Sequence, residues 1–376
     1  MSRKSTGNTI EDFRSAHGAL AERERSKFTT KIGELERTLK KKEELLSVAE
    51  DIRHAVFDLS EQDLAAPKWI EPIPRGKGKK VSMPVMLISD EQVGERVVAA
   101  EIEGVNHYDH NVYVQRHDLC AQKLVEITKN HMADQRCPVA CIAFLGDAIS
   151  GEIHAELAET NSLQSVPSTA LVVETRRNAI DFWLKHFEKL IVIVIPGNHG
   201  RTTMKPRFKR YSKMNYETLI GWWLQSLYAK EPRIKIVVPE SADYLLPVWG
   251  RNLFFTHGDR MGALSGKGSG MGFAGPVLPI VRGSKNIREQ QASFGRRIDY
   301  IHVGHYHEQG EAGGTFFNGT MAGYSEFAHG LRFRASPAMQ TLYFLNEEHG
   351  PTARWPIYLS AHPQADRSPD FAEIMK

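Results

Sequence analysis

The pattern of hydrophobic and polar positions from Val81 onward is that of an α/β domain. Short apolar runs predict strands, and they alternate with longer segments of helical periodicity. The predicted strands are Val85–Ser89, Ala140–Leu145, Leu190–Ile195, Leu253–Thr256, Tyr300–Val303, Thr315–Asn318 and Gln340–Leu345. The predicted helices are Asp118–His131, Thr169–Lys189 and Asn215–Ala229. Strands that alternate with helices indicate an α/β fold class.

The chain before this domain has a different pattern, which predicts a helical arm. Ser26 to Val56 is rich in Glu, Lys, Arg and Leu, and its apolar residues fall at heptad spacing, although Lys42 and Arg53 interrupt the seam. A coiled coil that forms a homodimer or binds a protein partner fits this pattern, and so does an amphipathic arm folded onto its own domain. We therefore expect a helical N-terminal arm at 1–66, a Pro- and Lys-rich linker at 67–82, the main domain at 83–345 and an irregular C-terminal tail at 346–376.

Composition and charge exclude several classes of protein. The 376 residues are 41% hydrophobic and 25% charged, which is enough apolar material for a large core and excludes a disordered chain. The net charge of +3 is small, so any basic surface must be local. The three cysteines have no CxxC spacing and favour a reducing compartment. No apolar run has the length of a membrane helix or signal peptide, so we expect a soluble, cytoplasmic protein with no membrane partner.

Polar residues that can bind metals follow each of the five central apolar runs. In chain order they are Asp90-Glu91-Gln92, Gly146-Asp147, Gly197-Asn198-His199, His257-Gly258 and Gly304-His305-Tyr306-His307. Ligand sites of α/β sheets lie beyond the carboxyl ends of the strands, so these residues should meet at one edge. Mixed carboxylate and imidazole ligands suit Mn²⁺, Fe or Zn²⁺, and a shared carboxylate can bridge two ions. The pattern therefore predicts a dinuclear metal centre.

The order and spacing of these motifs resemble the calcineurin-like metallophosphoesterase superfamily over roughly residues 83–345. The resemblance implies a two-sheet α/β/β/α sandwich, here with an N-terminal helical, coiled-coil-like extension. The Gly-Asn-His-Gly-Arg sequence, and the Ser-Gly-x-Ile-His sequence that follows Gly146-Asp147, look most like the phage and bacterial members that resemble DNA-repair exonucleases.

The resemblance also implies a role for each motif residue. Two divalent ions, Mn²⁺ by preference and Mg²⁺, Fe or Zn²⁺ as alternatives, would be held by Asp90, Gln92, Asp147, Asn198, His257, His305 and His307. Asp147 would bridge the two ions, and a hydroxide between them would attack the phosphorus. Asp147 and His199 are the expected catalytic residues, with His199 as the acid that protonates the leaving oxygen.

Two positions depart from the pattern of the superfamily. The first motif usually carries His where this chain has Gln92, and a neutral amide oxygen is a weaker ligand, one that favours Mn²⁺ or Mg²⁺. Glu91 or Glu95 could compensate, although we expect both on the solvated surface. The second departure is Gly200, where many members have Asp or Glu.

A basic segment after the third motif indicates which ester is bound. Arg201 to Lys213 contains six basic residues and no acidic one, with Phe208 and Tyr211 interleaved. This predicts nucleic acid, DNA by preference, as the partner and substrate, with Arg201, Lys205 and Arg207 on the phosphate. The leading hypothesis is thus a phosphodiesterase or nuclease. A phosphatase or phosphodiesterase of small nucleotides, and a catalytically weak binding or scaffold protein, are the alternatives.

Overall fold

The computed structural model describes Lys31, Gly33, Glu34, Arg37, Lys40, residues 80–261 and residues 277–362. The chain divides into two units, Met1–Gln62 and Asp63–Lys376. In the first unit the five described residues are helical, and Lys31 pairs with Glu34 across one turn at 3.8 Å. The heptad seam and the 67–79 part of the predicted linker lie outside the described residues.

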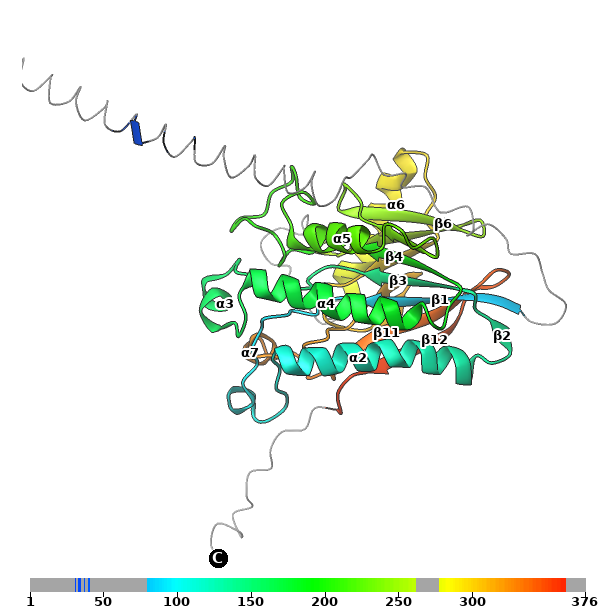
Figure 1. Ribbon diagram of the computed structural model, residues 1–376, viewed down its shortest axis with the longest axis horizontal. Coiled ribbons are helices and arrows are strands. Elements are labelled where there is room, and N and C mark those ends of the chain that lie inside the picture. The colour runs from blue at the N-terminus through cyan, green and yellow to red at the C-terminus, as the bar shows by residue number, and fades with distance from the viewer. Residues whose placement is uncertain are drawn as a thin grey trace, which may run out of the picture. The chain divides into compact units, whose positions relative to one another are not determined.

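The second unit contains two β-sheets (Figure 1). The first sheet has the order β12-β11-β1-β3-β4-β5, with the short β2 also paired to β1. Its strands are β1 (Lys80–Ile88), β2 (Gln135–Arg136), β3 (Val139–Phe144), β4 (Lys189–Val194), β5 (Ile234–Val237), β11 (Met339–Asn346) and β12 (Gly350–Tyr358). β1, β3, β4 and β5 are parallel, whereas β11 runs antiparallel to β1 and β12 antiparallel to β11.

The second sheet has the order β6-β7-β8-β10-β9, and β7, β8 and β10 are parallel. Its strands are β6 (Asp243–Val248), β7 (Arg251–Thr256), β8 (Tyr300–Val303), β9 (Gly310–Ala312) and β10 (Thr315–Phe317). The longer helices are α2 (His110–Glu126), α4 (Ser165–Trp183), α5 (Tyr216–Leu227) and α6 (Val277–Ser293). Shorter helical elements are η2 (Ala99–Ile102), η3 (Ile127–His131), α3 (Ala155–Thr160) and α7 (Glu326–Gly330).

Alternation along the strands explains why the two sheets form a layered sandwich. In β1, Met86 and Ile88 pack into one core with residues of α2, α4 and α5, while Val85 and Leu87 pack into a second core with residues of the other sheet. In β7, Phe255 faces that second core and Phe254 faces a third core that includes Ile280 of α6. The layers are therefore α/β/β/α, as expected.

Two boundaries differ from the sequence prediction. The predicted irregular tail at 346–376 is wrong for Gly350–Tyr358, which forms the edge strand β12. This strand contains Pro356, which an edge strand tolerates because one side of its backbone has no partner strand. The domain also begins earlier than residue 83, since β1 starts at Lys80.

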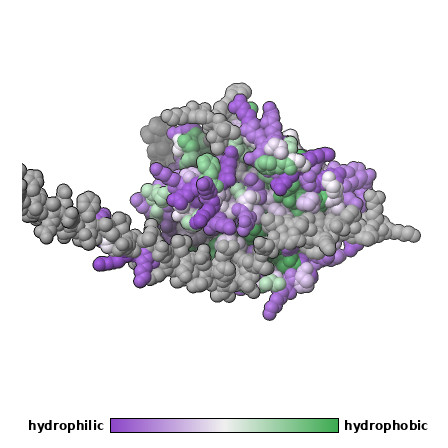
Figure 2. Space-filling model, turned by 90° about the horizontal axis from the view of Figure 1, so that it is seen from above, coloured by the Kyte–Doolittle hydropathy of each residue, from purple (hydrophilic) through white to green (hydrophobic). Residues whose placement is uncertain are grey.

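None of the described helices is long and apolar enough to cross a membrane. Figure 2 shows a face on which hydrophilic side chains project widely and hydrophobic residues form small, separate groups.

Candidate metal centre

The predicted site residues follow five strands from both sheets, and backbone hydrogen bonds hold the first two loops together. The Asp90 amide donates to the Gly146 carbonyl at 3.1 Å, and the Gln92 amide donates to the Asp147 carbonyl at 2.9 Å. These hydrogen bonds hold the loops after β1 and β3 side by side. The loops after β7 and β8 are joined in the same way, since the Gly304 amide donates to the His257 carbonyl at 2.8 Å.

Asp147, His257 and His305 form one cluster, in which one ligand atom from each residue lies within 4.8 Å of the others. His257 Nε2 is 3.0 Å from Asp147 Oδ2 and 3.0 Å from Asn198 Oδ1. His257 Nδ1 donates to the Leu145 carbonyl at 2.7 Å, which fixes the ring and directs Nε2 into the cluster. This is the arrangement that a metal-binding imidazole requires.

Asp90 and His307 form a second pair beside this cluster. His307 Nε2 is 3.3 Å from Asp90 Oδ1, and the His305 amide donates to Asp90 Oδ2 at 3.0 Å. Asp90 is fully buried, while the His307 side chain is 43% exposed. Gln92 is buried too, and its Oε1 accepts no hydrogen bond. A buried carbonyl oxygen without a donor is unfavourable, so this atom lacks a partner that a cation would supply.

Backbone strain is concentrated at these residues. In the described part of the chain, positive φ angles occur at nine non-glycine residues, and five of these are predicted metal ligands: Asp90, Gln92, Asp147, His305 and His307. Such conformations are unfavourable for residues with a Cβ and gather at functional sites. Close approach adds to the constraint, because a Cβ at Gly197 would collide with the Asp147 carboxylate.

Electrostatics within the site couple the carboxylates to the imidazoles. Burial alone would raise the pKa of Asp147, but His257 and His199 hold it well below its usual range. Burial disfavours the charged form of His257, yet the Asp147 carboxylate raises its pKa to about 10. Burial and the neighbouring His257 lower the pKa of His305 to about 4, so its ring is neutral.

His199 lies next to the cluster, and its backbone amide donates to Asp147 Oδ1 at 2.8 Å. Its Nδ1 lies 2.8 Å from the Ser150 carbonyl, which can only accept, so Nδ1 carries the proton and Nε2 is left for another partner. The side chain is half-buried. His199 is therefore fixed in orientation at the edge of the site.

The three predicted phosphate contacts are placed differently from one another. The Arg201 guanidinium donates to the carbonyls of Asn198, Thr203 and Met204 at 2.8, 2.9 and 3.1 Å, so most of its donors organise its own loop. Lys205 and Arg207 are exposed.

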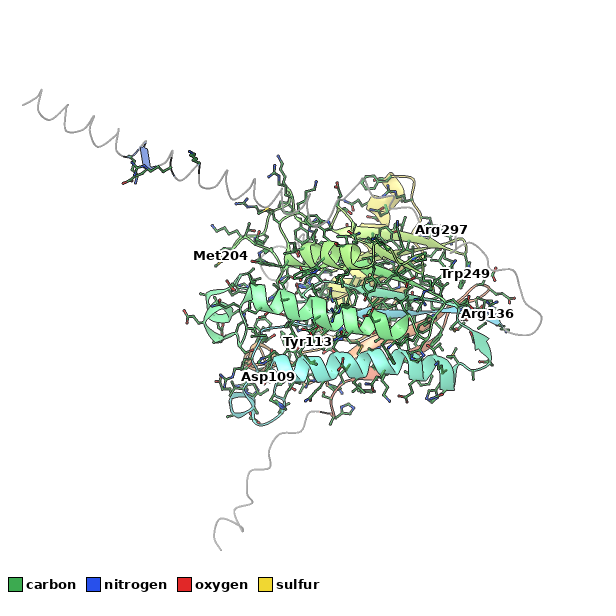
Figure 3. The ribbon with its side chains drawn as sticks, in the orientation of Figure 1. Asp109, Tyr113, Arg136, Met204, Trp249 and Arg297 are labelled. Atoms are coloured by element: carbon green, nitrogen blue, oxygen red, sulfur yellow. The ribbon has the colours of Figure 1, made fainter. Side chains whose placement is uncertain are left out.

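A buried ion pair beneath the first loop was missed. Glu91 is fully buried and not on the surface as expected; its carboxylate pairs with Arg176 of α4 and accepts from the Tyr113 hydroxyl of α2 at 3.1 Å. Tyr113 projects into the space between these two helices (Figure 3). The sequence does contain a signal: Arg176 is four residues from both Val172 and Ile180, on the apolar face of the helix.

Glu217 is a second residue that sequence reasoning missed. It is buried, accepts the Ala148 amide at 3.0 Å, and has no hydrogen bond to Oε2. Burial and the charge of Asp147 raise the pKa of Glu217 to about 7. A Cβ at Gly200 would collide with this carboxylate, which gives a physical reason for the glycine after Asn198-His199.

Comparisons with known proteins do not assign a family. No family model matches the chain, and no curated protein matches it. Solved structures that overlap with it include a predicted phosphoesterase from Streptococcus pneumoniae (9% identity, TM-score 0.26, 73% of this chain and 98% of that one). A hypothetical protein from Pyrococcus horikoshii overlaps at 11% identity and a TM-score of 0.35, over 73% of this chain and 88% of that one. Phosphopantetheinyl hydrolase from Mycobacterium tuberculosis overlaps at 11% identity and a TM-score of 0.25, over 64% of this chain and 89% of that one.

Proposed function

We propose that this protein is a metal-dependent phosphoesterase that hydrolyses phosphodiester bonds of nucleic acid. The observation that carries the proposal is the meeting of Asp147, His257 and His305 within 4.8 Å, next to the Asp90–His307 pair. Carboxylate and imidazole groups aimed at one another from two sheets are the donor set of a divalent metal centre.

The residues present fit two divalent ions. Asp90, Gln92 and His307 would hold one ion, Asn198, His257 and His305 the other, and Asp147 would contact both. Gln92 Oε1 has no hydrogen-bond partner, and His257 Nε2 is directed at the side chains of Asp147 and Asn198, where a shared cation would replace their direct contacts. When bound, such ions polarise the phosphoryl group and lower the pKa of water.

His199 supplies the proton for the leaving oxygen. Because Nδ1 donates to the Ser150 carbonyl, Nε2 can donate only when the ring is an imidazolium. Arg201 shapes the loop behind Asn198, while Lys205 and Arg207 remain available to contact phosphates outside the centre. The exposed cations of the basic loop and its exposed aromatic ring could contact several phosphates and a base at once, which favours nucleic acid over a small nucleotide.

The first test measures hydrolysis of bis-p-nitrophenyl phosphate by the full chain with Mn²⁺, Mg²⁺, Fe²⁺ or Zn²⁺, each against a chelator control. We expect turnover that requires metal and is strongest with Mn²⁺. Hydrolysis of mononucleotides but not of DNA or RNA would favour the small-nucleotide alternative. Inertness with all four metals would remove the enzymatic proposals and favour a scaffold.

With an oligonucleotide substrate, whose alkoxide leaving oxygen must be protonated, His199→Ala should lower kcat by about a hundredfold to a thousandfold, because it removes the acid without removing a metal ligand. Metal content, measured by mass spectrometry of the purified protein, should stay close to that of the wild type. Equal turnover in the variant and the wild type would exclude His199 as the acid.

Gln92→His should tighten metal binding by at least about tenfold, because an imidazole is a stronger ligand than an amide oxygen. Gln92→Leu has a similar volume with no ligand atom, and it should weaken binding. Competition with a metal-sensitive dye measures both. Affinity that is unchanged in both variants would mean that Gln92 does not coordinate.

A further inference from the structure

A cavity of about 460 Å³ lies between the loop that follows His199, residues 240–243 at the start of β6, and Arg260 after β7. It is lined in part by Phe208, Tyr211, Lys213, Glu240, Asp243 and Arg260. Its volume is within the roughly 300–1,000 Å³ typical of small-ligand pockets. Tyr211, which lines the cavity, donates from its hydroxyl to Asp259, and Asp259 lies two residues beyond His257, so the cavity adjoins the loop that carries this proposed metal ligand.

Both walls of the cavity are fixed in place. A bridge between Arg201 and Asn215 closes the base of the loop. The Ser212 hydroxyl donates to the Ser241 carbonyl at 2.7 Å and ties the loop to the segment before β6. The cavity is therefore a built feature of the fold.

One wall presents flat, stacking surfaces. The Arg260 guanidinium lies 3.8 Å from the centre of the Tyr211 ring, and the Tyr211 hydroxyl donates to Asp259 Oδ2 at 3.1 Å. Tyr211 and Arg260 thus form a stacked pair in the lining of the cavity, and a guanidinium plane can itself stack on an aromatic ligand. Phe208 is 90% exposed, so its ring can stack on a ligand.

The other wall carries carboxylates. Glu240 lies 3.5 Å from Lys213, and Asp243 begins β6. The lining also contains Arg210 and Lys213, so cations and carboxylates are mixed, and the carboxylates can accept hydrogen bonds from ring and amino N–H groups. A planar heterocycle with N–H donors can use both the stacking surfaces and these carboxylates.

We propose that this cavity binds the nucleobase next to the scissile phosphate, and that the substrate is therefore single-stranded. This inference rests on the proposed function, and it narrows the substrate class. A base can stack on Phe208 and Arg260 only after it has left its own helical stack, which costs least in a single strand.

The test compares a single-stranded oligonucleotide with an abasic strand of equal length, which has the same phosphates and no bases. The wild type should cleave the base-bearing strand with a kcat/KM at least about fivefold higher. Phe208→Ala and Arg260→Lys should bring this ratio close to one. Met204→Ala, at a 63% exposed side chain of the same loop that does not line the cavity, should leave the ratio unchanged (Figure 3).

Each contrary outcome has a distinct meaning. Equal cleavage of both strands by the wild type, or faster cleavage of the duplex, would overturn the base site and leave the phosphoesterase intact. If bis-p-nitrophenyl phosphate is not hydrolysed, the proposed function fails. Fluorescence anisotropy of labelled strands, in chelator, still tests the cavity: tighter binding of the base-bearing strand, lost in Phe208→Ala, supports the base site, and equal binding overturns it.

Discussion

Asp147→Asn should lose its metal and fall at least about a thousandfold in turnover of bis-p-nitrophenyl phosphate. The carboxylate is buried, its Oδ2 lies 3.0 Å from His257, and its Oδ1 accepts the His199 amide. Asparagine keeps the shape and can still accept from that amide, but it carries no charge to hold a cation between the two sheets. Metal content by mass spectrometry and turnover should therefore fall together.

The control for this variant is Asp134→Asn, the same change at an exposed carboxylate. It should retain wild-type metal content and turnover. Circular dichroism should show that Asp147→Asn is folded. Retention of both metal and activity by Asp147→Asn would contradict the placement of the centre.

Arg176→Met should lower the free energy of unfolding by about 3–5 kcal/mol. Arg176 and Glu91 are both fully buried, and the guanidinium also lies 3.8 Å from the centre of the Phe144 ring. Methionine retains apolar contact with that ring but leaves the Glu91 carboxylate without a cation, and an unpaired buried charge is strongly unfavourable. Urea denaturation followed by fluorescence measures the loss.

Two further variants isolate the charge effect. Arg177→Met changes the exposed neighbour and should alter stability by less than about 0.5 kcal/mol. The double variant Glu91→Gln/Arg176→Met removes both charges and should recover much of the loss. If Arg176→Met is as stable as Arg177→Met, the buried pair contributes no net stability.

The sequence predicts the strands that carry the site better than the rest of the fold. The five central apolar runs coincide with β1, β3, β4, β7 and β8, because each run is almost entirely buried and mostly apolar. The predicted boundaries are less accurate. Helix α2 begins at His110 and not at Asp118, because the Asp109 side chain caps its first turn by accepting hydrogen bonds from the amides of Asn111 and Val112. Helix α6 was missed, since Arg and Lys residues interrupt its apolar positions.

The supporting contacts of the site could not be predicted, for a physical reason. Glu91 and Arg176 are 85 residues apart, and Glu217 meets the Ala148 amide from 69 residues away. Local patterns report periodicity and turn chemistry, whereas these pairs depend on which helix covers which strand end. The hydrogen bonds that Arg201 donates to carbonyls of its own loop are likewise visible only in three dimensions.

Because the proposed ligands are divided between two sheets, assembly of the fold is linked to the binding of metal. Asp90, Asp147 and Asn198 follow strands of the first sheet, whereas His257, His305 and His307 follow strands of the second. A cation bound by both sets of ligands would cross-link the two sheets. Its binding free energy would then resist separation of the layers, so that starvation for metal would weaken the protein's resistance to heat and proteases as well as its chemistry.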